Sequence, residues 1–273
     1  MSIADASDQV EKLRAIVGTG STLISDPDIT ISYSRDHALF AQSAEPMCVL
    51  VARSTEEVAT VVKFANENNI PVVARGAGSG LSGGANAIAG CIVISLEKMT
   101  EILEIDSVNQ IARVQAGTIN LDLDAAAKEC GLAYLPDPAS RSWSTIGGNV
   151  ATNAGGMCCV KYGVTSHHVR AIKVVLASGE IIELGKATKK SVSTLDLLHL
   201  FIGSEGTLGI ITEITVGLEV RPKPPATLLA TFPGITEAAA AAAARGSCQS
   251  ARRISARHCR FIHGAPILAG LRL

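Results

Sequence analysis

The spacing of apolar residues predicts short helices and strands from the beginning of the chain. Apolar positions three and four apart over residues 8–17 are typical of a short amphipathic helix. The sequence after them shows no regular period as far as about Ala44, and this stretch is predicted to be irregular. A run of apolar residues over 48–52 then predicts a buried strand.

A start signal for a longer helix follows this strand. Ser54, with Glu57 three residues later, forms a capping box that predicts an amphipathic helix ending near Asn68. Pro71 lies at the start of the next strand, where its missing N–H is tolerable, and this strand runs to about Ala74. The order strand, helix, strand predicts a parallel pair joined by a crossover helix.

Hairpins and short helices are predicted for the rest of the chain. The sequence first predicts a strand over 91–95, a hairpin of 102–106 and 110–115, and a helix over 121–130 that Asn120 caps and Gly131 closes. A glycine-rich loop segment over 147–163 follows, and then a hairpin of 169–177 and 180–184 around a two-residue turn. The last predicted elements are a helix over 195–202 and a long strand over 208–220. A small α/β unit followed by hairpin-linked strands is typical of an α+β protein with two subdomains.

Composition limits the classes of protein to which the chain can belong. Apolar residues make up 47% of the 273 residues and charged residues 18%, which excludes a disordered chain. Aromatic residues are only 3%, which counts against a protein that stacks on nucleic-acid bases. The net charge of −1 predicts no general attraction to nucleic acid or to an anionic membrane. No nucleic-acid partner is therefore expected.

The cysteines and the apolar segments bear on the location of the protein. Seven cysteines without regular spacing or a C-x-x-C pair predict a reducing compartment and give no local support for a zinc or iron–sulfur site. The first residues lack the apolar core of a signal peptide, and no apolar run is long enough to span a bilayer. We therefore expect a cytoplasmic protein with no transmembrane segment and no metal.

A glycine-rich loop over 75–84 is the first candidate binding site. Glycines let backbone N–H groups approach an anion closely, so a diphosphate is the natural ligand for such a loop. Gly78, Gly80 and Gly83 match the dinucleotide fingerprint, but the residues after them are too few and too rich in glycine for the helix that this fingerprint requires. A nicotinamide site of this kind is therefore disfavoured, and no P-loop motif occurs.

Two more segments of small residues, 146–156 and 203–209, are similar to this loop in composition. A single glycine loop could be no more than a flexible turn. Three such segments beside apolar strands instead favour backbone from several places lining one large, flat ligand. Because few positive charges lie in these segments, we expect main-chain N–H groups to hold its phosphates.

Four motifs in this order make the chain resemble a known family. They are ARGAGSGLSGG, PDPASRSWSTIGGNVATNAGG, KYG and GSEGTLGIITEITV. With them, residues 36–244 resemble the FAD-binding module of the vanillyl-alcohol-oxidase-type (PCMH-type) flavoproteins. Within that family the chain is most similar to the D subunit of bacterial glycolate oxidase and to flavin-linked D-lactate and D-2-hydroxyglutarate dehydrogenases.

The resemblance implies a PCMH-type fold, in which two α+β subdomains hold one FAD between them. The implied cofactor-binding residues are Arg75, Gly76, Ala77, Gly78, Ser79, Gly80, Leu81 and Ser82 around the diphosphate, Pro136, Asp137 and Pro138 along the cofactor, Thr145, Gly147, Gly148, Asn149, Asn153, Ala154 and Gly155 at the isoalloxazine and ribityl groups, and Glu205, Gly209, Ile210 and Ile211 on the adenine side. Members that attach FAD covalently often use a histidine in the first loop. Because 75–84 contains none, non-covalent FAD is expected.

The resemblance also implies a reaction and partners. The reaction is oxidation of a small 2-hydroxy acid such as glycolate or D-lactate to the 2-oxo acid, with hydride passing from the substrate α-carbon to flavin N5. The family's segments of the type H-A-G-D-G-N and G-E-H-G do not occur here, so no catalytic residue can be named. Flavoprotein and iron–sulfur partner subunits are implied, and through them a place at the membrane periphery. Two alternatives stay open, namely a non-catalytic flavin-binding module and a truncated remnant that does not bind FAD.

The resemblance divides the chain into five parts. These are an N-terminal helix and lead-in segment (1–44), a first FAD-binding subdomain (45–105), a second (106–222), the start of a missing cap domain (223–244) and a basic tail foreign to the family (245–273). The tail contains six arginines and no acidic residue. We expect a shifted reading frame or an equivalent truncation near Ala244 or Arg245, and a genuine basic tail for a partner or nucleic acid is the alternative.

A structural role is favoured for most other residues that could carry chemistry. Cys158 and Cys159 could be redox-active, yet a reactive thiolate needs a cationic neighbourhood that the sequence does not show. His167 and His168 have no third metal ligand nearby. Trp143, the one tryptophan, could pack near the flavin or in the core.

Overall fold

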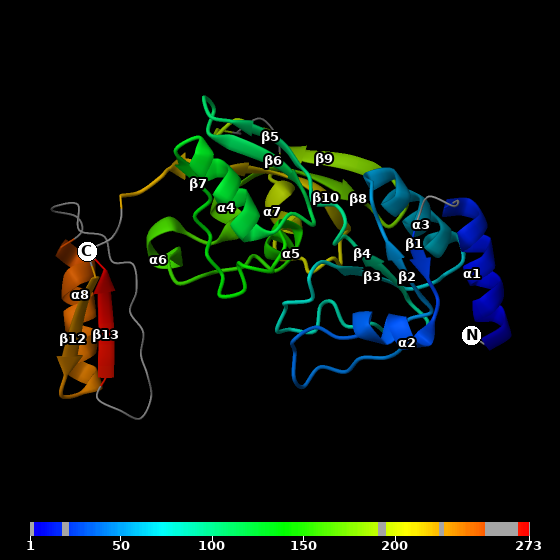
Figure 1. Cartoon of the computed structure of the whole chain (residues 1–273), viewed down its shortest axis with the longest axis horizontal. Coiled ribbons are helices and arrows are strands. Elements are labelled where there is room, and N and C mark those ends of the chain that lie inside the picture. The colour runs from blue at the N-terminus through cyan, green and yellow to red at the C-terminus, as the bar shows by residue number, and fades with distance from the viewer. Residues whose placement is uncertain (1–2, 18–21, 191–194, 224–226, 249–266, 273) are drawn as a thin grey trace.

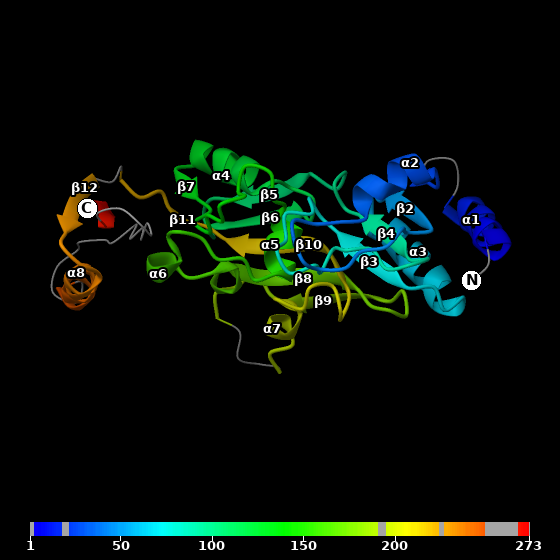
Figure 2. The ribbon, with the colours of Figure 1, turned by 90° about the horizontal axis from the view of Figure 1, so that it is seen from below.

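Two β-sheets form the body of the molecule in this computed structural model, which describes residues 3–17, 22–190, 195–223, 227–248 and 267–272. The first sheet has the strand order β1 (Thr22–Ile24), β2 (Cys48–Val51), β4 (Ile92–Ser95), β3 (Val72–Arg75). The second has the order β5 (Ile102–Asp106), β6 (Ile111–Gln115), β10 (Ile210–Gly217), β8 (Val169–Val175), β9 (Ile181–Gly185). The sheets lie next to each other, with helix α5 (Ile146–Ala151) near their junction (Figures 1 and 2). This arrangement confirms the α+β class.

The first sheet is mainly parallel. Strands β2 and β4 are buried along their whole length, which explains why their sequences are continuously apolar. The strands at 48–52 and 71–74 are parallel and joined by a helix, as predicted, but they do not pair directly, because β4 lies between them and runs parallel to both. The half-buried β3 is the edge strand, and Pro71 directly before it removes no ladder hydrogen bond there.

Helices α1 (Ile3–Val17) and α3 (Thr55–Glu67) pack against each other beside this sheet (Figure 1). Helix α3 begins where the capping box predicts. The Ser54 hydroxyl accepts the Glu57 N–H at 3.2 Å, and the Glu57 carboxylate accepts the Arg53 N–H at 2.8 Å. The Ser54 half of the box is therefore present, whereas the Glu57 carboxylate bonds to the N–H of the residue before the cap instead of that of Ser54.

The lead-in segment is more regular than predicted. It contains β1, which pairs antiparallel with β2, and two short helices, α2 (Pro27–Thr30) and the 3-10 helix η1 (Ile31–Tyr33). Helix α1 also begins earlier than residue 8. A strand of three residues is too short to show an alternating pattern in the sequence. It forms because it pairs with β2, which lies further along the chain.

The second sheet is antiparallel and has one apolar and one charged face. Val174 and Ile214 are fully buried on the apolar face. On the other face Lys173 lies 2.8 Å from the Glu213 carboxylate, and Arg113 lies 3.7 Å from the same group. Both predicted hairpins are present as β5–β6 and β8–β9. The alternation of apolar and charged residues along these strands accounts for the successful prediction.

Three predicted elements of this half differ from the structure. The strand over 208–220 is divided, since β10 ends at Gly217 and β11 (Glu219–Val220) pairs with an unpredicted strand, β7 (Leu132–Ala133). The helix over 195–202 is only α7 (Leu198–Phe201). The turn between β8 and β9 is longer than two residues, with Leu176 N–H donating to the Glu180 carbonyl at 2.9 Å. Ile214, Val216, Leu218 and Val220 continue one alternation of apolar residues across both strands, so the change of partner leaves no mark in the sequence.

The structure also corrects two predictions around the second glycine-rich segment. Helix α4 (Asn120–Glu129) starts near the predicted position and is followed by Gly131 at a φ of 71°, but Asn120 does not cap it, because its side chain bonds to Pro136 and Asn149 instead. The region predicted as a loop over 147–163 contains α5 and α6 (Cys159–Tyr162), and the 3-10 helix η2 (Thr165–His167) follows it.

A small third unit follows the second sheet. Strand β12 (Thr227–Phe232) pairs antiparallel with β13 (Ile267–Arg272), and α8 (Ile235–Cys248) lies between them in the sequence. Helix α8 runs across the predicted start of the basic tail, and most of that tail (249–266 and 273) lies outside the described residues. The five-part division stays a prediction. None of the described helices is long and apolar enough to cross a membrane.

Candidate cofactor site

A cleft of about 350 Å³ lies where the two sheets meet. Its volume is in the range of roughly 300–1,000 Å³ that small-molecule sites occupy. The structure brings most of the predicted site residues together in its lining, namely Arg75, Gly76, Ala77, Gly78, Ser79, Gly80, Leu81, Ser82, Thr145, Gly147, Gly148, Asn149, Asn153, Ala154, Gly155, Glu205, Gly209, Ile210 and Ile211. The three separate small-residue segments therefore share one cleft.

Close backbone contacts hold these segments against one another. A Cβ added at Gly76 would lie 2.5 Å from the Thr145 hydroxyl, so the first loop touches the start of α5. A Cβ added at Gly84 would lie 2.5 Å from the Glu205 carboxylate, and Glu205 N–H donates to the carbonyl of Ala151 at 2.8 Å. A larger residue at Gly76 would displace the Thr145 hydroxyl that caps α5, whereas at Gly84 the end of the Glu205 side chain would have to move.

The backbone of the loop after β3 offers unused hydrogen-bond donors. For each residue from Gly76 to Ser82, no described residue accepts the main-chain N–H. Unpaired amides that are partly buried are rare in folded proteins, so a run of them indicates room for an anionic ligand. That these main-chain groups hold the phosphates stays a prediction.

Asp36 supports this loop from behind and was not predicted as a site residue. Its carboxylate accepts the N–H of Gly83 at 3.0 Å and that of Ala38 at 2.8 Å. The N–H of His37 donates to the Gly80 carbonyl at 3.0 Å. The lead-in segment thus fixes the loop, although nothing in its sequence around Asp36 signals this contact.

The Arg75 guanidinium lies inside the loop rather than free in the cleft. It fills the space that a Cβ would need at Gly78, whose φ of 69° also requires glycine. It lies 6.0 Å from the Tyr33 ring centroid and 3.4 Å from the Ala85 carbonyl. Burial lowers the pKa of Arg75, while the charge of Asp36 opposes that shift. The Arg75 side chain is therefore part of the structure of the loop.

The other wall of the cleft is helix α5. Thr145 caps this helix, and its hydroxyl accepts the Gly148 N–H at 3.1 Å. A Cβ at Gly147 would lie 2.6 Å from the Ala116 Cβ, so the helix packs directly on the residue after β6. The short helix was not predicted, since two adjacent glycines disfavour helix, and only the Thr145 cap could have indicated it.

The three residues Pro136, Asp137 and Pro138 are not brought into the cleft lining. Pro136 is linked to α5 through Asn120, and Asp137 is bonded to the residue that precedes α6. The Pro136 carbonyl accepts a hydrogen bond from Asn120 at 3.2 Å, and the Asp137 carboxylate accepts the Cys158 N–H at 3.0 Å. Lining residues that the prediction did not include are Asp36, Ala74, Gly84, Ala85, Leu96, Ala116, Ser140, Ala151, Thr152 and Gly206.

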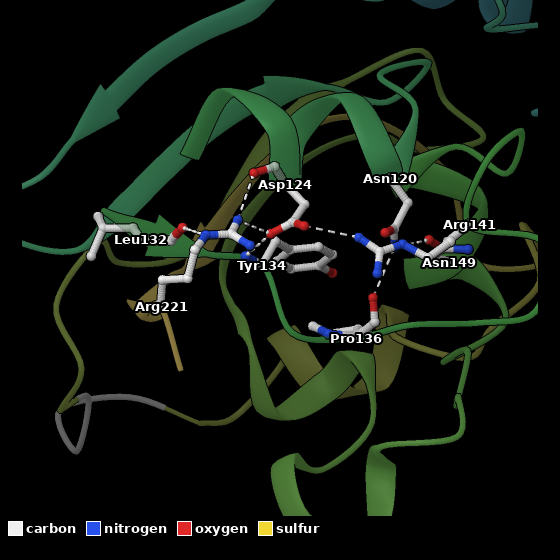
Figure 3. A network of polar contacts seen from close by, with 8 residues as sticks. All are labelled: Asn120, Asp124, Leu132, Tyr134, Pro136, Arg141, Asn149 and Arg221. Atoms are coloured by element: carbon white, nitrogen blue, oxygen red, sulfur yellow. Dashed lines mark hydrogen bonds and ion pairs between the residues drawn. The ribbon is translucent and has the colours of Figure 1, made fainter. Parts of the chain in front are cut away.

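A polar network fixes the segment that leads into α5 (Figure 3). The Asp124 carboxylate accepts hydrogen bonds from Arg141 at 3.0 Å, from Arg221 at 2.7 Å and from the Tyr134 N–H at 3.2 Å. Arg221 also donates to the Leu132 carbonyl at 2.9 Å. One carboxylate thus joins α4, the segment after β7 and the residue after β11.

The remaining candidate residues have contacts that suit structural roles. His168 is buried, and its Nε2 donates to the Tyr162 carbonyl at 2.9 Å. Burial lowers the pKa of His168. Cys158 and Cys159 are not joined in a disulfide, and no cluster of three potential metal ligands occurs among the described residues. Trp143 packs on His37, with ring centroids 4.9 Å apart.

Comparison with known proteins identifies the family. The sequence pattern of a family described as FAD binding domain matches residues 46–185. The chain belongs to this FAD-binding family. FAD is therefore its cofactor, as predicted, and the unpaired amides of the first loop and the glycine-lined cleft suit a long dinucleotide that carries a diphosphate.

Relatives of this FAD-binding chain are longer oxidoreductases. A D-lactate dehydrogenase of Anaerostipes hadrus is 45% identical over 230 residues, which are 84% of this chain and 48% of the relative. The glycolate oxidase subunit GlcD of Bacillus subtilis (strain 168) is 44% identical over 207 residues, which are 76% of this chain and 44% of the relative. The chain spans about half the length of the curated relatives it matches.

The fold agrees with this family. The crystal structure of p-cresol methylhydroxylase with substrate bound matches with a TM-score of 0.77 at 21% identity, over 91% of this chain and 50% of that chain. This likeness confirms the predicted PCMH-type fold.

Proposed function

We propose that this chain is the FAD-binding part of an oxidoreductase that converts a small 2-hydroxy acid, such as glycolate or D-lactate, to the 2-oxo acid. The observation that carries the proposal is its 44–45% identity to proteins named for these two substrates. FAD, when bound, supplies the two-electron acceptor, so the substrate loses a hydride and its hydroxyl proton. Flavoprotein and iron–sulfur partner subunits are part of the proposal, because the glycolate oxidase relative is named as a subunit.

In this proposal each wall of the cleft has its own task. The unpaired amides from Gly76 to Ser82 bind the diphosphate, α5 with Asn149 borders the isoalloxazine and ribityl groups, and the segment around Glu205 borders the adenine. The attachment is non-covalent, and none of the described lining residues is a histidine, cysteine or tyrosine. Release of all flavin into the supernatant on acid precipitation would support this, whereas flavin retained by the protein would contradict it.

A second candidate function is a non-catalytic flavin-binding module. One observation favours it: the only charged side chains in the described lining are Asp36, Arg75 and Glu205, and Arg75 is engaged within the loop. Oxidation of a hydroxy acid needs a cation for the carboxylate and a base for the hydroxyl proton. The one cation of the described lining is therefore already used inside the loop and is not free for a substrate carboxylate.

Anaerobic bleaching of the flavin separates the two functions. The chain loaded with FAD is mixed with glycolate, D-lactate or, as control, L-lactate, and absorbance in the flavin band is followed. We expect slow bleaching by glycolate or D-lactate, because the described cleft offers few groups to orient substrate. If dithionite reduces the flavin fully while no 2-hydroxy acid bleaches it, the chain acts as the non-catalytic module instead.

A further inference from the structure

One carbonyl fixes the orientation of a buried side-chain amide behind the cleft. Asn120 is fully buried, and its Nδ2 lies 3.2 Å from the Pro136 carbonyl and 2.9 Å from Asn149 Oδ1. A backbone carbonyl can only accept a hydrogen bond, so the NH₂ group of Asn120 must face Pro136. The Asn120 amide cannot be reversed without setting two oxygens against each other.

This orientation leaves one oxygen without a partner. Asn120 Oδ1 is buried, and no described residue donates to it. An unpaired buried acceptor costs about 1–3 kcal/mol, so folds rarely keep one without a reason. Here the two donors of the same amide are both used, one on Pro136 and one on Asn149.

The orientation of Asn120 determines that of Asn149 (Figure 3). Because Asn149 Oδ1 accepts the bond from Asn120, the Nδ2 of Asn149 must be directed away from it. Asn149 lines the cleft, and no described residue accepts a hydrogen bond from this nitrogen. The nitrogen is not fully enclosed by protein, and because Asn149 lines the cleft, it is open to the cleft.

We propose that Pro136, Asn120 and Asn149 form a relay that presents the Asn149 NH₂ group as a hydrogen-bond donor to an acceptor atom of FAD. Asn149 contacts the cofactor, and Asn120 is a positioning residue that acts through it. The acceptor is a ring carbonyl or nitrogen of the flavin, or an oxygen of the ribityl–diphosphate chain, since both kinds accept from an amide. The relay also gives Pro136, which lies outside the cleft lining, an indirect part in binding.

The first test replaces the donor without changing its shape. In Asn149→Asp one carboxylate oxygen can still accept from Asn120, while the other takes the place of the donor. We expect the FAD dissociation constant, measured by quenching of flavin fluorescence in the full chain, to rise about tenfold or more. The matched control is Asn66→Asp, the same change at an exposed position of α3, which should alter affinity less than twofold.

The flavin absorption spectrum then distinguishes the two kinds of acceptor. A weaker complex whose bound flavin has a shifted spectrum places the donor on the ring. A weaker complex with the wild-type spectrum places it on the ribityl–diphosphate chain. Both results support the proposal. Unchanged FAD affinity in Asn149→Asp would overturn it, as would a wild-type chain that binds no FAD.

A double-mutant cycle tests whether Asn120 acts through Asn149. Asn120→Leu should weaken FAD binding about tenfold in the wild-type background and less than twofold in the Asn149→Ala background, because the orientation of Asn120 then has nothing to control. Affinities are measured well below each thermal midpoint, so that all variants are folded. An equal loss in both backgrounds would mean that Asn120 only supports the fold, and the relay would be rejected. If Asn120→Leu does not fold, Asn149→Asp still decides the donor.

The relay can fail while the proposed function holds. It is read from FAD affinity, whereas the proposed function is read from bleaching by hydroxy acids.

Discussion

The loop after β3 and helix α5 line the same cleft but are built in different ways. The loop presents main-chain amides that no described residue accepts, and a carboxylate from the lead-in segment, Asp36, holds it from behind. Helix α5 is fixed by buried side chains, with Asn149 bonded to Asn120 and the preceding segment tied to Asp124. The difference indicates that the loop is suited to bind a charged group, whereas helix α5 is suited to fix the orientation of a ligand.

The largest effect is expected where the helical wall packs on backbone. In Gly147→Val the new Cβ would meet Ala116 at 2.6 Å, and the buried helix would have to move. We expect the free energy of unfolding to fall by about 3 kcal/mol and FAD binding to be lost. Urea unfolding followed by circular dichroism measures the first effect.

The control for this change is another glycine in the same half. Gly131 has a φ of 71° but nothing within 4 Å of its would-be Cβ. Gly131→Ala should therefore cost only about 1 kcal/mol, from backbone strain. Equal costs at the two glycines would show that α5 is not held tightly against Ala116.

The next effect concerns the carboxylate that joins the segments behind α5. Asp124→Ala removes the acceptor shared by Arg141, Arg221 and the Tyr134 N–H. We expect a loss of about 2 kcal/mol in the free energy of unfolding, because two partly buried guanidinium groups lose their partner. Asp122→Ala, an exposed change in the same helix, serves as control. If Asp124→Ala lowers the free energy of unfolding no more than Asp122→Ala does, this network does not stabilise the fold.

A smaller effect is expected at the loop, and on affinity more than on stability. Asp36→Ala frees the Gly83 and Ala38 N–H groups and loosens the diphosphate loop. We expect FAD to bind about tenfold more weakly, with the thermal midpoint of the FAD-free chain little changed. Asp36→Asn, which keeps only one of the two acceptors, should restore only part of the affinity. If the alanine variant binds FAD as wild type does, the loop does not depend on its support from behind.

The smallest effect is a pH dependence of the side that carries α5. Burial lowers the pKa of His168 from its usual 6.5, so the unfolded chain binds a proton more readily than the folded one. Stability that is full above pH 6.5 should therefore fall as the pH drops below it, by at most about 1.4 kcal/mol per pH unit for one proton. Urea unfolding across this range, compared with His168→Gln, measures it. The same slope in both chains would mean that other groups titrate.

Local signals made much of this fold predictable. The helix cap at Ser54 and the alternating strands of the two hairpins depend on residues close in sequence, and the structure contains them. The glycines of the cleft were found because small residues are needed wherever backbone approaches backbone or a cofactor. All of these signals can be recognised within short stretches of sequence.

Contacts between distant segments could not be predicted in the same way. Asn120 stands at the start of a helix, where asparagine normally caps, but its partners Pro136 and Asn149 are reached only after the chain folds. Asp36 lies in a segment without a regular apolar period, and its carboxylate supports the loop by accepting the N–H of Gly83, which lies far along the chain. In both cases the residue type was visible and the partner was not.

Nuclear magnetic resonance of the backbone amides during an FAD titration tests the central claim most directly. The account holds that three separate small-residue segments bind FAD together, largely through main-chain N–H groups. It predicts that the signals of Gly76 to Ser82, Gly148 and Gly206 shift in parallel with one binding curve. If FAD binds while these signals stay in place and others far from the cleft move, the account is contradicted.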